Sequence, residues 1–89
     1  MKIKMKRYRN DVTGFKLRRR LDFAIKNDSE IILDFEGADN CELQCMKEIL
    51  RKYRHFRENN TVVKVQNAPD SLATLLLLLN INNKNIFIT

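Results

Sequence analysis

The sequence is poor in the residue types that build catalytic sites and cofactor-binding loops. Its 89 residues include two glycines, one proline, one histidine and no tryptophan. Two glycines are too few for a glycine-rich loop whose backbone amides cradle a phosphate. The single His55 has no cysteine, serine or threonine close to it in sequence, which favours a structural histidine over a catalytic one. The chain is therefore expected to be non-catalytic and to need no cofactor.

Cysteine is scarce as well. Cys41 and Cys45 are too few for a disulfide framework, which makes a reducing cytoplasm the expected compartment. Four residues apart on one helix face, their Cβ atoms would lie farther apart than the roughly 3.8 Å that a disulfide needs. As zinc ligands they would need two partners, and only His55 and carboxylates remain, so buried thiols are favoured over a metal site.

Long apolar runs are missing too. The run "LLLLL" at 75–79 is far shorter than the about 20 apolar residues of a membrane-spanning helix. Residues 1–10 alternate basic residues and lack the apolar region of a signal peptide. An apolar content of 44% and a charged content of 31% are typical of a soluble globular protein. We expect a single domain spanning residues 1–89.

Positive charge is concentrated at the start of the chain. Residues 1–26 hold ten Lys and Arg against Asp11 and Asp22, a net +8, whereas the other 63 residues hold seven basic and nine acidic residues, a net −2. The simplest interpretation is a solvated face. The alternative is a small nucleic-acid-binding protein, or contact with an anionic membrane. Tyr8 alone offers a stacking aromatic on the basic strand, which falls short of a platform. The nucleic-acid alternative would use Lys2, Lys4, Lys6, Arg7, Arg9, Arg18, Arg19 and Arg20.

Hydrophobic periodicity predicts strands that alternate with helices. The alternation in "KIKMKRY" predicts a basic N-terminal strand within residues 1–10, and "IILDF" at 31–35 predicts a strand buried on both faces. Further strands are expected at 61–65 and in the final "NIFIT". Apolar stripes predict helices near 14–27, 43–58 and 70–80. This order indicates an α/β sandwich with about four strands in a parallel or mixed sheet and about three helices.

Several local features are expected within these elements. Asp11 or Thr13 is placed to cap the first helix, and Glu48 precedes Lys52 by four residues as an ion pair on the outer face of the second. The predicted core consists of Leu21, Ile25, Ile32, Leu33, Leu50, Tyr53, Val63, Val65 and Leu76.

Taken as a block, residues 30–89 resemble the STAS domain, the fold of bacterial anti-sigma factor antagonists. The resemblance is carried by "IILDFEGAD", which is similar to the strand before the family's functional loop, and by "MKEILRKYRHFRENN", which is similar to its long second helix. The segments "TVVKVQNAPDSLATLLLLLNI" and "FIT" match the following strand, turn and helix and the last strand. The first helix extends the resemblance back to about Gly14.

The chain departs from the family at its phosphorylation switch. The family motif Asp-Ser-Ser-Gly, whose first hydroxyl a partner kinase phosphorylates, falls on Glu42, Leu43, Gln44 and Cys45. Leu43 therefore replaces the phosphoacceptor, which implies constitutive binding. The family domain also usually starts with two strands and can end in another helix, whereas this chain has room for one N-terminal strand and no final helix.

The resemblance implies a non-catalytic protein-interaction module whose partner is an anti-sigma factor, a kinase-like ATPase or a transporter subunit. The implied partner-binding residues are Asp39, Asn40, Cys41, Glu42, Leu43, Gln44 and Lys47. Leu43 has two alternatives, burial in the core or exposure as an anchor for the partner, and we favour the anchor. Because Leu75 to Leu79 surround a helix that one sheet covers on one side only, a homodimer is also expected.

Overall fold

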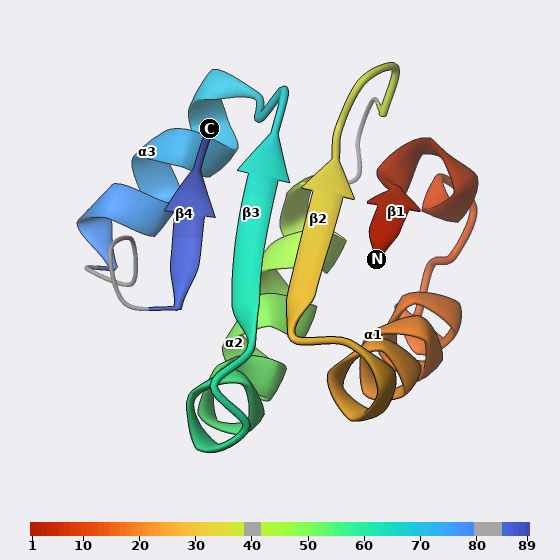
Figure 1. Ribbon diagram of the computed structural model, residues 1–89. Helices are drawn as coiled ribbons and strands as arrows, with labels where there is room; N and C mark the ends of the chain where they lie inside the picture. The colour runs from red at the N-terminus through yellow and green to blue at the C-terminus, as the bar shows by residue number, and fades with distance from the viewer. Residues whose placement is uncertain (39–41, 80–84) are drawn as a thin grey trace.

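A computed structural model describes residues 1–38, 42–79 and 85–89, without the side chains of residues 42 and 44–46. Strands and helices alternate along the chain (Figure 1), as the sequence predicts. The strands are β1 (Lys2–Lys4), β2 (Glu30–Asp34), β3 (Val62–Gln66) and β4 (Ile86–Ile88). The helices are α1 (Phe15–Asn27), α2 (Glu42–Glu58) and α3 (Asp70–Leu78), and a 3-10 helix, η1 (Met5–Tyr8), follows β1. The α/β prediction is confirmed.

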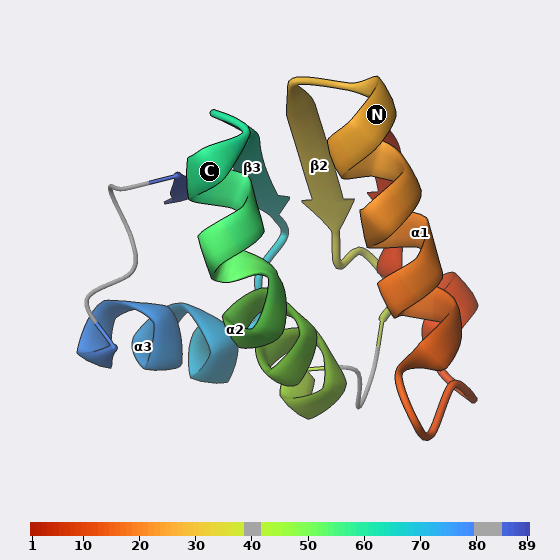
Figure 2. The ribbon, with the colours of Figure 1, turned by 90° about the horizontal axis from the view of Figure 1, so that it is seen from below.

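The four strands form one parallel sheet in the order β1-β2-β3-β4. Parallel neighbours need a crossover between them, and the helices serve as these connections. Figures 1 and 2 show the three helices on the same side of the sheet. Side chains that point toward the helices, such as Ile31, Leu33, Val63 and Val65, are buried, so the core lies between the sheet and this helical layer.

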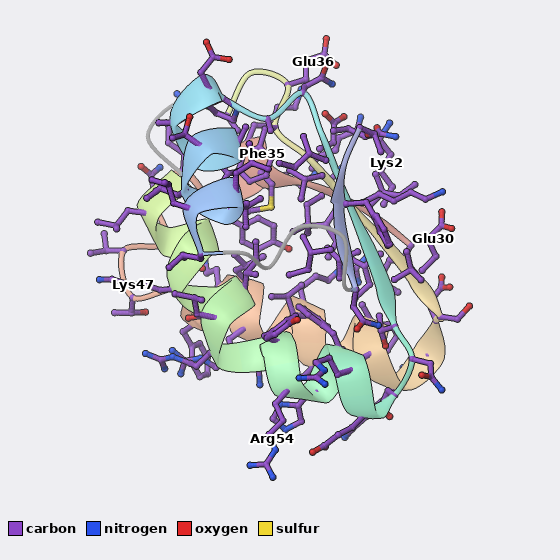
Figure 3. The ribbon with its side chains drawn as sticks, turned by 90° about the vertical axis from the view of Figure 1, so that its left-hand side faces the viewer. Lys2, Glu30, Phe35, Glu36, Lys47 and Arg54 are labelled. Atoms are coloured by element: carbon purple, nitrogen blue, oxygen red, sulfur yellow. The ribbon has the colours of Figure 1, made fainter. Side chains whose placement is uncertain are left out.

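No helix of the described chain covers the opposite face of the sheet. One row across this uncovered sheet face consists of Lys2, Ile32, Lys64 and Phe87. Lys2 and Glu30 project from it, away from the helices (Figure 3). Strand β2 is therefore buried on one face only, and the prediction of burial on both faces is wrong, because every crossover passes on the same side. Ile32, predicted as core, is only partly buried for this reason.

The core confirms most of the other predicted positions. Five predicted residues are buried, and Ile25 and Tyr53 are partly buried against them. The prediction that Leu50 belongs to the core is wrong, because half of its surface is exposed while Ile49 and Phe56 of the same helix are fully buried. Helix α2 is thus rotated so that Ile49 and Phe56 face the sheet. The confirmed buried residues are Leu21, Leu33, Val63, Val65 and Leu76.

The N-terminal segment is a strand for only three residues. After β1 the chain turns into η1, and this brings Met5 into the core with 1% of its surface exposed. Gly14 occupies the N-cap position of helix α1, and both of the residues predicted as alternative caps bond to the first amides of the helix. The Asp11 carboxylate accepts hydrogen bonds from the backbone amides of Lys16 (3.3 Å) and Leu17 (3.0 Å), and the Thr13 hydroxyl accepts one from Phe15 (3.3 Å). These bonds satisfy amide groups that a helix start leaves unpaired.

Helices α1 and α2 are joined by two ion pairs. Glu48 pairs with Arg18, and Lys52 pairs with Asp22. The predicted pair between Glu48 and Lys52 along the outer face of α2 is therefore wrong. Both side chains turn toward α1 instead, because α1 offers a partner of opposite charge to each of them.

Candidate protein-docking surface

The loops that follow the strands gather at the carboxyl end of the parallel sheet, where ligand and partner sites of α/β proteins usually lie. Here η1 follows β1, residues 35–38 follow β2, and residues 67–69 follow β3. A side-chain carbon of Lys6 in η1 lies 3.8 Å from the position that a Cβ atom on Gly37 would take. The first and second of these loops are therefore in close proximity.

Asp34, the last residue of β2, ties these loops together. Its carboxylate is 5% exposed and accepts hydrogen bonds from the Asn67 side chain (2.9 Å) and the Glu36 backbone amide (3.0 Å). The Lys2 ammonium lies 3.6 Å away. The Asn67 hydrogen bond, followed by the Glu36 amide and Lys2, lowers the pKa of Asp34. Neighbours from β1 and from the loop after β3 thus keep the Asp34 carboxylate ionised. Through its hydrogen bond with the Glu36 amide, Asp34 positions the start of the segment that leads into α2.

The predicted partner-binding residues are only partly within the described chain. Asp39, Asn40 and Cys41 lie outside the described residues, and Glu42 and Gln44 belong to the first turn of α2 without described side chains. Leu43 and Lys47 are both exposed, Leu43 with 66% of its surface. Of the two alternatives for Leu43, the structure shows the exposed one.

Leu43 and Lys47 continue into a longer exposed stripe that sequence reasoning missed. Leu50, half exposed, and Arg54 follow at the helical spacing that keeps side chains on one face. We call these four residues the α2 stripe. Figure 3 shows Lys47 and Arg54 projecting outward from the helix. The seven-residue spacing from Leu43 to Leu50 was the available signal, but it also fits a core position.

A small hollow borders the α2 stripe on the side of α1. Its volume is about 160 Å³, and it is lined by Val12, Thr13, Gly14, Lys47, Glu48 and Arg51. Val12, just before α1, is 83% exposed. The entry to α1 and the outer side of α2 thus form one surface that carries exposed apolar side chains.

This surface is positively charged. Among the described residues, Lys47 and Arg51 have no ion-pair partner, and Arg54 pairs with the exposed Glu58 at 3.1 Å. Leucines flanked by cations along one helix face are suited to an amphipathic partner segment with acidic side chains. The surface therefore offers apolar side chains that anchor a partner and positive charges that favour an acidic one.

The eight basic residues of the nucleic-acid alternative do not form a single patch. Lys2 and Lys4 lie on the uncovered sheet face, Lys6 lies beside Gly37, and Arg18 is bonded to Glu48. The remaining four are divided between the exposed segment at the end of η1 and the outer side of α1. These are Arg7, Arg9, Arg19 and Arg20.

His55 is exposed and borders a hollow of about 340 Å³ near the end of α2, together with Asp22, Ile25, Lys26 and Asn59. The described part of the chain holds no group of three or more histidine, cysteine or acidic side chains arranged for a metal ion. Cys41 and the Cys45 side chain lie outside that part. Nor is any described helix long and apolar enough to cross a membrane.

Comparison of the chain with protein-family models, with curated proteins and with solved structures finds no match.

Proposed function

We propose that the chain is a non-catalytic protein-interaction module of the STAS-like type, acting in the cytoplasm. The observation that carries the proposal is the exposure of Leu43 in the first turn of α2, where the resembling family has its phosphoacceptor. An apolar side chain of this size with 66% of its surface exposed gains free energy when a partner covers it. The α2 stripe is the docking surface.

Binding at this surface has an apolar and an electrostatic part. Full burial of one leucine contributes about 1.5–3 kcal/mol, and Leu43 and Leu50 supply two anchors. Lys47 and Arg51 favour a partner with acidic side chains and speed its approach. Because leucine cannot be phosphorylated, a kinase cannot switch the contact at this position, and binding is constitutive. The partner classes implied by the resemblance are an anti-sigma factor, a kinase-like ATPase or a transporter subunit.

We further propose that the module forms a homodimer. The supporting observation is that Leu72 and Leu76 of α3 are buried whereas Leu77 and Leu78 are 60% and 76% exposed. Clustered exposed leucines commonly mark an interface. The uncovered sheet face, on the opposite side of the sheet from α3, is a second surface that a partner copy could cover, since parallel sheets are normally covered on both faces.

A photo-crosslinking experiment tests the docking surface directly. A photoreactive phenylalanine analogue replaces Leu43 in the cells that make the protein, and a second variant carries it at the exposed His55, twelve residues further along α2 and outside both proposed interfaces. The Leu43 probe should capture an acidic protein that the His55 probe does not. The captured protein is then purified for titration calorimetry against Leu43→Asp and the control His55→Asp.

Leu43→Asp should remain folded, because an acidic residue is favourable in the first turn of a helix, and should abolish binding. His55→Asp should bind like the wild type. Unchanged affinity of a folded Leu43→Asp variant, or a Leu43 probe that captures no specific protein, would refute the proposed surface.

A further inference from the structure

The outer side of α1 carries an open hollow with cationic and aromatic walls. Its volume is about 390 Å³, within the range of small-ligand pockets. It is lined by Tyr8, Lys16, Arg19, Arg20 and Phe23. We call it the α1 hollow. Tyr8 comes from η1 and the others from α1, so the fold brings together residues that are separated by a turn and a helix start.

The acidic residues of this region point elsewhere. Asp11 is 8% exposed and caps α1 by accepting the amides of Lys16 and Leu17, while Asp22 pairs with Lys52 of α2. In the described structure no carboxylate lies within ion-pair distance of the three cations that line the hollow. None of the described carboxylates therefore neutralises its positive charge.

Aromatic rings are exposed beside these cations. Phe15 is 54% and Phe23 51% exposed, and each has a guanidinium 5.8 Å from its ring centre, Arg19 at Phe15 and Arg20 at Phe23. Each cation–π contact places a guanidinium against a ring. The guanidinium N–H groups of Arg19 and Arg20 have no hydrogen-bond acceptor among the described residues and can bind an external anion in a bidentate manner.

We propose that the α1 hollow binds single-stranded nucleic acid, at a site separate from the α2 stripe. Lys16, Arg19 and Arg20 lie within about one turn of α1 and contact successive phosphates. The exposed ring of Phe23 is a surface on which an unpaired base stacks, and the partly buried ring of Tyr8 borders it. A single strand fits better than a duplex, since only unpaired bases expose their faces to such rings.

An anionic membrane surface is the main competing occupant. An interfacial helix needs a continuous apolar face that inserts among the lipids. On α1 the two exposed rings are each paired with an arginine instead, and the ring of Phe23 borders a hollow. This alternation matches the composition of single-strand binding surfaces more closely.

Fluorescence anisotropy with labelled oligo(U) and oligo(dT) of about 12 nucleotides tests the proposal. The wild-type full chain should bind at least one of them, and log affinity should fall with log salt with a slope near −2, as expected for about three phosphates on a single strand. Replacing both arginines, Arg19→Gln with Arg20→Gln, should remove most of the binding. The control Arg51→Gln with Arg54→Gln removes the same charge from α2 and should change affinity far less.

A second variant separates stacking from charge. Phe23→Leu keeps an apolar side chain and every cation but removes a ring, and should weaken binding by about 5-fold or more. If the Arg51/Arg54 variant lost as much affinity as the Arg19/Arg20 variant, binding would depend on net charge alone, and the proposed site would be overturned. Unchanged affinity of Phe23→Leu would overturn it as well. Failure to bind either oligonucleotide at about 50 mM salt, with or without binding to phosphatidylserine vesicles, would also overturn it.

Discussion

The Arg18 guanidinium clamps the buried carboxylate of Glu48 across the interface of α1 and α2. Its Nε donates to Oε2 and its Nη2 donates to Oε1, both at 3.2 Å, and Glu48 is 2% exposed. The hydrogen bond to Glu48 raises the pKa of Arg18. Gly14 lies against the same carboxylate, since a Cβ atom there would be 2.8 Å from Oε1. This contact sets the position of α2 relative to the start of α1, and hence the surface that combines the α2 stripe with Val12.

Removal of Arg18 is predicted to destabilise the protein, because it leaves a buried carboxylate without its partner. Arg18→Met should lower the melting temperature more than the matched Arg19→Met, whose guanidinium has no carboxylate partner in the described structure. The double variant Arg18→Met with Glu48→Leu should recover most of the loss, since it removes both charges. Thermal melts followed by circular dichroism provide the comparison. Equal melting temperatures for the two single variants would contradict the role given to this pair.

Neighbouring residues of α2 are predicted to respond very differently to truncation. Ile49→Ala should lower the free energy of unfolding by about 2–5 kcal/mol, because Ile49 is fully buried. Leu43→Ala, at a mostly exposed side chain, should change it by about 0.5 kcal/mol or less. The loss in the free energy of unfolding for Leu50→Ala should lie between these two values. Urea denaturation of the three variants measures the series, and a cost for Leu43→Ala equal to that of Ile49→Ala would place Leu43 in the core.

Asp34 predicts a specific acid dependence of stability. Its pKa is lowered in the folded state, first by Asn67, so the unfolded chain binds more protons below the ordinary value of 3.8. Its contribution is therefore complete above pH 3.8 and is lost as the pH falls through the lower folded pKa. In Asp34→Asn this contribution is absent at every pH.

The stability advantage of wild type over Asp34→Asn should thus be largest near about pH 5 and shrink toward about pH 2.5, as measured by urea midpoints. Asp70→Asn, at an exposed residue of α3, serves as the matched control. A difference between wild type and Asp34→Asn that stays constant across this range would rule out the proposed linkage.

Self-association through α3 is predicted to depend on its exposed leucines. Light scattering at about 100 μM should give a dimer mass for the wild type. Leu77→Lys with Leu78→Lys should give the monomer mass at the same concentration, without loss of the fold by circular dichroism. A monomeric wild type, or a double variant that remains dimeric, would count against this interface.

Local pattern was sufficient to predict the four strands and three α-helices of this fold, but not the 3-10 helix η1. The helices begin and end within about two residues of their predicted bounds, because stripes such as Leu17 and Leu21 repeat with the helical period. The sequence offers Asp11 or Thr13 as a cap because both lie just before the first apolar turn, and the structure shows that both bond to amides at the helix start. The exposed position of Leu43 was the favoured one of two alternatives that the sequence left open.

Which face of each element is buried was decided by the tertiary structure. The run at 31–35 is apolar except for Asp34, and Ile32 is only partly buried because all three helices lie on the other side of the sheet. On α2 two overlapping apolar stripes were available, and packing against the sheet selected Ile49 and Phe56 over Leu50.

Long-range pairing was equally invisible in the linear pattern. Glu48 has a suitable partner four residues later, yet it bonds to Arg18, thirty residues earlier, because the α1–α2 interface buries it there. The α1 hollow was likewise not predictable from the linear pattern, because Tyr8 and Phe23 line one hollow only when η1 packs beside α1. Sequence by itself determined the elements, their order and the basic character of the first 26 residues, since these depend on local periodicity and composition. Which side chains share a surface was decided only by the tertiary structure, because that depends on how each element is rotated in the packed core.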